Sequence, residues 1–242
     1  MEEMQGQVKT MLKKGVIEPS SSPWSAPAIL VQKKSPDGRA KYRFCIEQRA
    51  LNKVTQFDTY PLPIFEEIVS TLHGSQYFSV LDCYSSFWQL NLAEEDKMKK
   101  AFSVPSGHYN CLRLPYGLSN SPASFQRLMD LVLKDLVGNE CYVFIDDVIE
   151  YGNTIEEHAS RLSHVLERFD RANLQLQPGK CVFAQPQVEY LGYIFSRDGI
   201  RASPDKTKAG RNYPIPKNVK DVRSILGLAF FYQTRCQDSP RW

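Results

Sequence analysis

The sequence lacks the residue patterns of disulfide-rich, zinc-binding and triad-bearing proteins. Its 242 residues include six cysteines, but no Cys-x-x-Cys pair occurs and no histidine stands at zinc-ligand spacing. The scattered cysteines therefore predict reduced thiols in a core. The four histidines have no serine, cysteine or acid near them in a pattern typical of a catalytic triad, so we interpret them as structural. They are His73, His108, His158 and His164.

Long apolar runs are also missing. The N-terminal segment has no apolar stretch of the kind found in secretory signals, and no window approaches the ~18 continuous apolar residues of a membrane-spanning helix. We therefore expect a soluble, intracellular protein with no membrane partner. No internal repeat or low-complexity tract is present.

Composition predicts a folded chain with an uneven distribution of charge. Hydrophobic residues make up 42% of the chain and charged residues 24%, which is enough for one globular unit that has room for two lobes. Net charge is only +3, yet bases outnumber acids seven to two between residues 31 and 53, and eight to three between residues 197 and 223. Two basic segments around an acidic middle suggest walls that hold phosphate backbones, and two solvated surfaces are the alternative.

The apolar run CYVFIDDVIEYG contains two adjacent acids, Asp146 and Asp147. The flanking residues are β-branched or aromatic and predict two short strands, the second of which ends at Gly152. We therefore expect both acids at the tip of a hairpin. Because unpaired acids are costly to bury, a hard divalent cation such as Mg²⁺ is the expected partner. For an isolated Asp-Asp pair, the alternative is an exposed acidic turn.

A third acid, Asp82, ends another short apolar strand that is predicted from Tyr77 to Leu81. One strand that delivers an aspartate, together with a hairpin that delivers two more, is an arrangement by which polymerases hold two metal ions about 4 Å apart for in-line phosphoryl transfer. In that chemistry one ion activates the attacking hydroxyl and the other neutralises the leaving pyrophosphate.

The remaining pattern predicts an α+β fold. Apolar periodicity indicates helices that end before Gly15, Gly74 and Gly138, together with a long amphipathic helix over residues 155–172. The second of these helices is expected to begin at Pro61-Leu62-Pro63, and the third at Ser121-Pro122, with the serine as N-cap. Further strands are expected over residues 28–33, 42–46 and 188–195, the first two joined by a turn at 35–38, and two short helical stretches are expected to end near Tyr232.

Seven segments in order closely resemble the reverse transcriptase of gypsy-type LTR retrotransposons. They are WSAPAILVQKK, YRFCIEQRALNKVT, YPLPIFEEI, YFSVLDCYSSFWQL, AFSVPSGHYNCLRLPYGLSNSPASFQRLM, VFIDDVIEYGNT and EYLGYIFSRDGI, and the resemblance covers roughly residues 8–232. Each segment alone is a weak pattern, but their order makes chance similarity very unlikely.

The resemblance implies an α+β right-hand polymerase, with fingers, an antiparallel palm sheet backed by helices, and a truncated thumb. We assign residues 1–75 to the fingers, 76–196 to the palm, with part of 88–120 belonging to the fingers, and 197–242 to a partial thumb whose tail diverges from about residue 233. It also implies RNA-directed DNA polymerase activity, which adds dNTPs to a primer 3′-hydroxyl on an RNA or DNA template. Two Mg²⁺ ions, with Mn²⁺ as a substitute, would serve as cofactors.

Site residues also follow from the resemblance. Asp82, Asp146 and Asp147 match the catalytic metal ligands. Phe87 matches the aromatic gate that excludes ribonucleotides, and Tyr116 with Gly117 match the loop that lines the nucleotide pocket. The bases that match the triphosphate-binding side chains of the fingers are Arg43 and, less securely, Lys33, Lys34 or Lys41. The hairpin that grips the primer end is matched by Leu191, Gly192 and Tyr193.

Several residues depart from the family pattern. Phe144 stands where the acidic motif usually begins with tyrosine, and Glu47 and Gln48 replace an aspartate and an aromatic residue. Glu150 occupies a strand position that is normally aliphatic, and if it points inward we expect it to cost about 1 to 3 kcal/mol unless it is paired. After Tyr232 the resemblance ends in QTRCQDSPRW, which predicts a fragment or decayed copy without RNase H or integrase regions.

Two functions follow from these patterns, and a third is disfavoured. The first is a reverse transcriptase that is weak, distributive and salt-sensitive, and the second is a non-catalytic relic of a Pol polyprotein that binds nucleic acid. A metal-dependent nuclease also uses clustered carboxylates, but here the acids fall in polymerase order. The further partners expected are a second copy of the chain or the remainder of the polyprotein. The expected place is a cytoplasmic virus-like particle or the nucleus.

Overall fold

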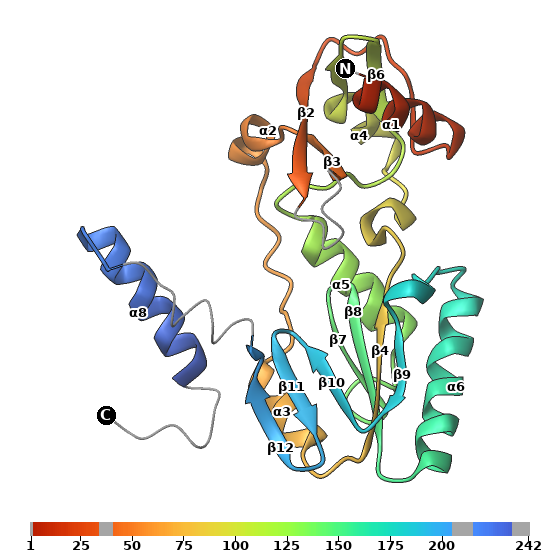
Figure 1. The fold of residues 1–242 in the computed structure, drawn as a ribbon. Helices are drawn as coiled ribbons and strands as arrows, with labels where there is room; N and C mark the ends of the chain where they lie inside the picture. The colour runs from red at the N-terminus through yellow and green to blue at the C-terminus, as the bar shows by residue number, and fades with distance from the viewer. Residues whose placement is uncertain (1, 34–40, 205–214, 234–242) are drawn as a thin grey trace. The chain divides into compact units, whose positions relative to one another are not determined.

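The computed structural model describes residues 2–33, 41–204 and 215–233, and its fold is α+β, which confirms the predicted class (Figure 1). The chain forms two compact units, which are described separately. Unit 1 comprises Met1–Pro61 and Tyr84–Leu128, and unit 2 comprises Leu62–Cys83 and Met129–Trp242. The assignment of residues to fingers, palm and thumb stays a prediction.

Unit 1 is built on a five-stranded sheet in the order β1-β6-β5-β2-β3, in which β2 and β5 are parallel and the other pairs are antiparallel. Its strands are β1 (Ile17–Pro19), β2 (Ala26–Lys33), β3 (Lys41–Ile46), β5 (Phe102–Val104) and β6 (Gly107–Cys111). Helix α1 (Glu2–Lys13) buries Val8 and Met11 in a core that includes Phe44 and Phe102. As predicted, α1 stops before Gly15, which has a φ of +61°.

Short helices complete unit 1. They are α2 (Arg49–Val54), η1 (Ser86–Gln89), α4 (Glu94–Lys97) and η2 (Met98–Lys100). Helix α5 (Ser121–Val132) begins in unit 1 and continues into unit 2. The predicted turn at residues 35–38 lies outside the described residues, but the register of β2 with β3, from Ala28 opposite Ile46 to Lys33 opposite Lys41, agrees with a hairpin.

Unit 2 is built on a four-stranded antiparallel sheet in the order β7-β8-β4-β9. The strands are β7 (Cys141–Phe144), β8 (Asp147–Gly152), β4 (Tyr77–Asp82) and β9 (Val182–Gln185). Alternate residues of β4 face opposite sides, so Phe78, Val80 and Asp82 share one face. Helix α6 (Ile155–Arg171) packs by Val165 and Phe169 and is capped by Thr154, whose hydroxyl accepts the Glu157 N–H.

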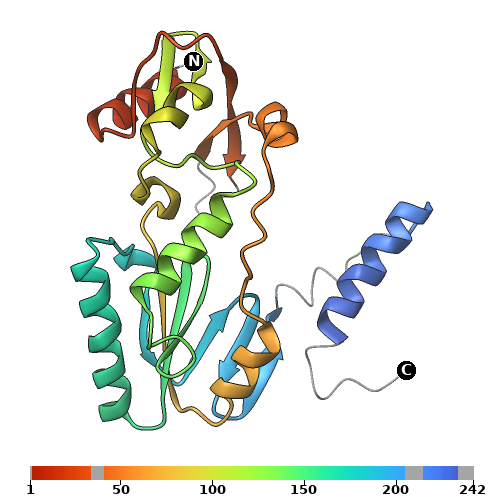
Figure 2. The ribbon, with the colours of Figure 1, turned by 180° about the vertical axis from the view of Figure 1, so that it is seen from behind.

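A second, three-stranded sheet of β10 (Gln187–Tyr190), β11 (Tyr193–Ser196) and β12 (Gly199–Ala202) packs against α3 (Phe65–Leu72), as Figure 2 shows from behind. The prediction of one strand over residues 188–195 was wrong. Leu191 and Gly192 both have positive φ, +51° and +81°, and form a two-residue turn that separates β10 from β11.

Two predicted helices have different bounds in the structure. The extended backbone of Ile64 after Pro63 delays α3, which starts at Phe65, and α5 ends at Val132, although the following Leu133 and Leu136 are still buried. Of the two helical stretches expected after residue 204, one falls on residues 205–214, outside the described part, and the other is α8 (Val219–Gln233). No helix among the described residues is long and apolar enough to cross a membrane.

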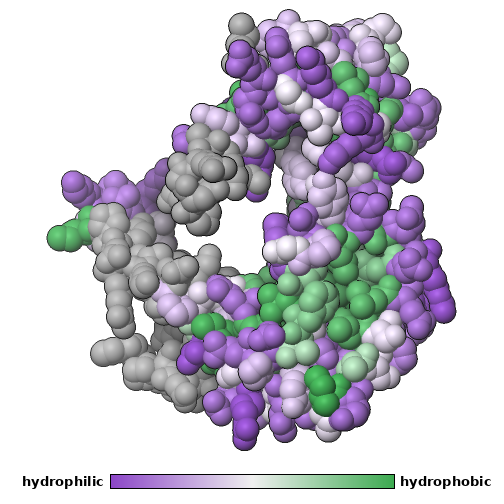
Figure 3. All heavy atoms as spheres, turned by 45° about the vertical axis from the view of Figure 1, so that its right-hand side comes forward, coloured by the Kyte–Doolittle hydropathy of each residue, from purple (hydrophilic) through white to green (hydrophobic). Residues whose placement is uncertain are grey.

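The surface of unit 2 is partly apolar. A broad hydrophobic area lies on the face shown in Figure 3. Large apolar side chains exposed in this unit include Val182 and Phe183 of β9, which is an edge strand of the four-stranded sheet.

Candidate active site

The structure brings the three sequence-predicted aspartates together on unit 2. Strand β4 ends at Asp82 and the adjoining strand β8 begins at Asp147, and these two residues are direct register partners. Directly opposed residues of an antiparallel pair have Cβ atoms about 5 Å apart and project to the same face. The face that carries them is the one that presents Phe78 and Ile149 to the apolar core farther along the same strands.

Asp146 lies in the turn that connects β7 to β8. Because Phe144 pairs with Asp147, the loop consists of only Ile145 and Asp146. Ile145 has a φ of +59°, the positive value that a type II′ turn requires at its first central position and that glycine usually supplies. A β-branched residue there costs of order 1 kcal/mol. The strained turn places two consecutive carboxylates at one end of the sheet.

Electrostatics also show that the three acids are close. Burial and, to a smaller extent, the charges of Asp146 and Asp82 raise the pKa of Asp147 to about 6, although Lys180 acts to lower it. The Tyr190 hydroxyl donates to the Asp147 backbone carbonyl at 3.1 Å, which fixes the start of β8. A half-buried carboxylate among like charges stabilises any cation that reaches it.

A fourth charged residue completes the cluster. The Lys180 ammonium donates to both carboxylate oxygens of Asp82, at 3.0 and 2.8 Å. Lys180 is the last residue of η3 (Pro178–Lys180), in the connection from α6 to β9. The contact with Asp82 raises the pKa of Lys180, and the charges of Asp146 and Asp147 act in the same direction. Sequence analysis missed this residue because 98 positions separate it from Asp82.

The donor set fits a hard divalent cation, because carboxylate oxygens are the ligands that Mg²⁺ and Mn²⁺ prefer. In the described part of the chain, no group of three or more His, Cys, Asp or Glu side chains is already gathered as a metal site. Asp82 is bound to Lys180 instead. The assignment of the three aspartates as metal ligands therefore stays a prediction, supported by their common edge and by the raised pKa of Asp147.

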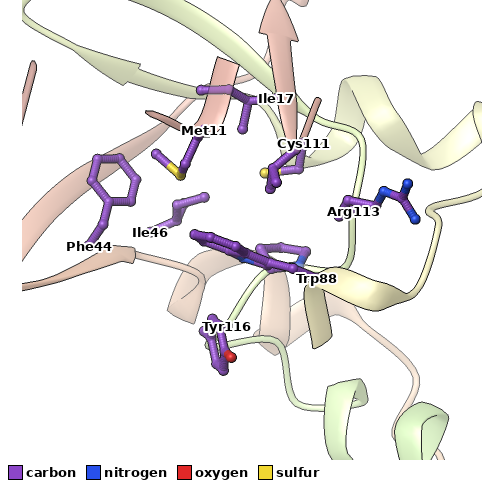
Figure 4. A pocket seen from close by; sticks show the side chains of 10 residues that line it. Met11, Ile17, Phe44, Ile46, Trp88, Cys111, Arg113 and Tyr116 are labelled. Carbon is purple, nitrogen blue, oxygen red and sulfur yellow. The ribbon is translucent and has the colours of Figure 1, made fainter. Parts of the chain in front are cut away.

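The predicted nucleotide-binding aromatics lie together in unit 1. The ring centroids of Phe87 and Tyr116 are 5.0 Å apart, and Trp88 contacts Tyr116 from another side at 6.2 Å. Trp88 and Tyr116 also line a small pocket with apolar side chains of α1, β1 and β3 (Figure 4). The neighbouring Gly117 has a φ of +98°, and its carbonyl accepts a 2.9 Å hydrogen bond from Asn52.

The predicted triphosphate-binding bases lie on the β2–β3 hairpin. Arg43 is exposed on β3 opposite Val31, and Lys33 is opposite Lys41 at the end of the pairing. Lys34 lies outside the described residues. A cationic edge of this kind suits phosphate binding.

The predicted primer-binding segment is the β10–β11 turn. Leu191 and Gly192 form the turn itself, and the Gly192 carbonyl accepts the Ser203 N–H at 3.0 Å. Tyr193 is fully buried, with its ring centroid 4.5 Å from that of Phe65. The ring of Tyr193 therefore anchors the turn in the core, and only the turn is left for contact with a ligand.

A buried polar cluster lies on the four-stranded sheet of unit 2, on the face opposite to Asp82 and Asp147. Glu150 is the register partner of Ser79, and the His158 Nε2 atom lies 2.7 Å from a Glu150 carboxylate oxygen and 2.9 Å from the Ser79 hydroxyl. Burial raises the pKa of Glu150 to about 8 and lowers that of His158. Both shifts favour a neutral pair. Glu150 therefore points inward, which is the case in which a cost in stability was expected, and His158 is buried beside it, while a purely structural role of His158 stays a prediction.

Comparisons with known proteins agree with this geometry. Residues 31–195 match the family described as reverse transcriptase (RNA-dependent DNA polymerase). The chain is 41% identical over 98% of its length to the retrovirus-related Pol polyprotein from transposon opus, and 42% identical over 96% to that from transposon 297, both of Drosophila melanogaster. It spans 24% and 22% of those relatives.

Solved structures give the same result. The foamy viral protease-reverse transcriptase dRH in complex with double-stranded DNA is similar with a TM-score of 0.84 and 26% identity, over 95% of this chain and 40% of that one. The same viral protein in complex with an RNA/DNA hybrid is similar with a TM-score of 0.80 and 25% identity, over 96% of this chain and 31% of that one. A family match over most of the chain and a shared fold lead to one conclusion, that the chain belongs to the reverse transcriptase family.

Proposed function

We propose that the chain is the catalytic part of an RNA-directed DNA polymerase of a retrotransposon Pol protein. The observation that carries the proposal is the pairing of Asp82 with Asp147 on neighbouring strands, with Asp146 in the adjoining turn. In the proposed reaction a primer 3′-hydroxyl attacks the α-phosphorus of a dNTP and pyrophosphate leaves. The template is RNA or DNA, and the rest of a Pol polyprotein or a second copy of the chain is the proposed protein partner.

The three aspartates would hold two Mg²⁺ ions, for which Mn²⁺ can substitute. Bound at this edge, the ions would supply Lewis-acid activation of the primer hydroxyl and neutralise charge on the leaving group. The chain itself positions the carboxylates. The register of β4 with β8 would fix two of them, and the strained Ile145 turn would fix the third. No covalent nucleophile is needed.

The side chains of unit 1 are proposed to select and hold the nucleotide. Phe87 would lie against the sugar and exclude a ribose 2′-hydroxyl, with Tyr116 packed on its ring. Gly117 would let the backbone approach the substrate, and Arg43 with Lys33 would bind the triphosphate. In unit 2 the Leu191–Gly192 turn would contact the primer end.

Primer extension on poly(rA)/oligo(dT) tests this function with dTTP and MgCl₂. We expect wild-type extension to be weak, distributive and salt-sensitive, and Asp146→Asn to lower it by about 10²-fold or more. Asp198→Asn, which changes an exposed acid in the β11–β12 turn, is the matched control and should extend like wild type. Binding of the duplex without extension would instead support the non-catalytic relic, and cleavage without extension would support a nuclease.

A further inference from the structure

The ion pair between Lys180 and Asp82 is asymmetric in its exposure to solvent. The Lys180 side chain is 66% exposed, whereas that of Asp82 is 20% exposed. The ammonium sits on a flexible four-carbon stem and can swing into water at little cost. The carboxylate, at the end of a central strand, has no such freedom.

The backbone, rather than chance side-chain placement, brings Lys180 to this carboxylate. The Gln177 N–H donates to the Asp82 carbonyl at 2.8 Å, and Leu176 forms a β-bridge with Cys83. The Lys180 N–H in turn donates to the Gln177 carbonyl at 2.9 Å, which closes the η3 turn. The connection from α6 to β9 is therefore attached to the end of β4 just before it delivers the ammonium.

The ammonium and a divalent ion compete for the same atoms. Both oxygens of Asp82 accept from the Lys180 Nζ atom, so a metal ion that binds Asp82 competes with these hydrogen bonds for the same two oxygens. The positive charge of Lys180 also repels an incoming cation across the few ångströms that separate them. In the absence of metal, the same charge offsets the repulsion among Asp82, Asp146 and Asp147.

We propose that Lys180 is an internal counter-cation, which occupies Asp82 until a divalent metal ion displaces it. Lys180 thereby stabilises the metal-free protein and weakens its affinity for metal. The proposal rests on the function proposed above, because it takes the three aspartates as the metal ligands. It assigns Lys180 a positioning role and requires no step of the reaction.

Metal binding to the full chain tests the proposal without any measurement of activity. The probe is MnCl₂ at pH 8, and free Mn²⁺ is followed by its EPR signal. We expect Lys180→Met to bind Mn²⁺ about threefold to tenfold more tightly than wild type, since it removes both the competing donor and the repulsion. Lys180→Arg keeps the charge and should stay within about twofold of wild type.

The metal-free protein supplies a second measurement. Lys180→Met should lower its melting temperature by a few degrees, and MnCl₂ should raise the melting temperature of this variant more than that of wild type. Lys134→Met is the matched control, because Lys134 is an exposed lysine of the same unit, in the turn after α5, and should change neither quantity.

The outcomes separate this proposal from the proposed function. If wild type binds Mn²⁺ as tightly as Lys180→Met does, or more tightly, the counter-cation proposal is wrong, and the proposed metal site is unaffected. If neither protein binds Mn²⁺, both the counter-cation and the metal site are overturned. Binding by Lys180→Met alone would support the proposal in its strongest form.

Discussion

The two faces of the four-stranded sheet in unit 2 treat a buried acid in opposite ways. Asp147 and Glu150 lie three residues apart on β8 and project to opposite faces, and burial raises the pKa of both, to about 6 and about 8. Asp147 has acids as neighbours and a partly exposed lysine within reach. Glu150 has a histidine in contact with it and is fully buried.

The difference teaches how one strand serves both chemistry and stability. An acid that is to receive an external cation must keep its charge and its access to solvent, and the fold bears the electrostatic cost. An acid that is sealed in a core loses its charge, because burial raises its pKa, and it lies against an internal polar side chain instead.

The largest effect is expected from removing the internal partner of Glu150. His158→Leu leaves a buried neutral carboxyl group with one polar neighbour fewer and should lower the free energy of unfolding by about 2 to 3 kcal/mol at pH 7. In the Glu150→Val background the same substitution should cost much less, because no acid is left behind. Urea denaturation of the four proteins gives the coupling energy. Equal costs in the two backgrounds would show that the pair is not coupled.

A smaller effect should follow from replacing Glu150 with an aliphatic residue. Because the folded protein holds the Glu150 proton more tightly than the unfolded chain, wild type loses stability as pH rises from about 4.5 to about 8. Among the charged groups around it, Arg161 opposes this shift and Glu140 and Glu157 add to it.

Glu150→Val should therefore be more stable than wild type by about 1 to 2 kcal/mol at pH 8.5, with a smaller gain at pH 5. Glu189→Val, which changes an exposed acid on β10, is the control and should show no such trend with pH. A gain in stability that is the same at pH 5 and at pH 8.5 would show that buried Glu150 does not titrate between these values.

The smallest effect concerns the face of the sheet that carries Asp82 and Asp147. The pKa of Asp147 is raised from 3.8 to about 6, so wild type loses stability as pH rises through that window. Asp147→Asn should raise the melting temperature of the metal-free protein by about 2 to 4 °C at pH 8, by less at pH 5 and hardly at all at pH 3, below both pKa values, and the gain is modest because solvent screens a half-buried carboxylate. The variant should also lose primer extension. A lower melting temperature of the variant at pH 8 would show that ionised Asp147 does not destabilise the metal-free protein.

Local patterns in the sequence predicted much of the sheet and of the candidate site. The apolar strands that end or begin at Asp82 and Asp147 have the alternation and β-branched content of a half-buried sheet, so the position of each acid followed from its own neighbours. The helix ends at Gly15 and near Gly74 were equally local. The split of residues 188–195 into two strands was missed because alternating apolar residues hid the turn signal of Gly192.

Contacts between distant segments could not be predicted in this way. His158 meets Glu150 only because α6 folds back over the sheet, and neither residue carries a local sign of the other. Gly152 reflects that approach, since a Cβ atom there would lie 2.8 Å from the His158 backbone nitrogen. Lys180 reaches Asp82 through the connection after α6, whose path depends on the length of that helix and on the pairing of β9 with β4.

Leu176 and Gln177 are attached to the end of β4, so the number of residues that follow them before Lys180 matters for the site. Leu176 and Gln177 are each held to a backbone partner beside Asp82, so the count of residues between them and Lys180 sets which side chain arrives at the carboxylate. Inserting one residue after Gln177 would lengthen the η3 turn and present a neighbour of Lys180 to the carboxylate. The number of residues in one surface turn thus determines which charged side chain lies beside Asp82.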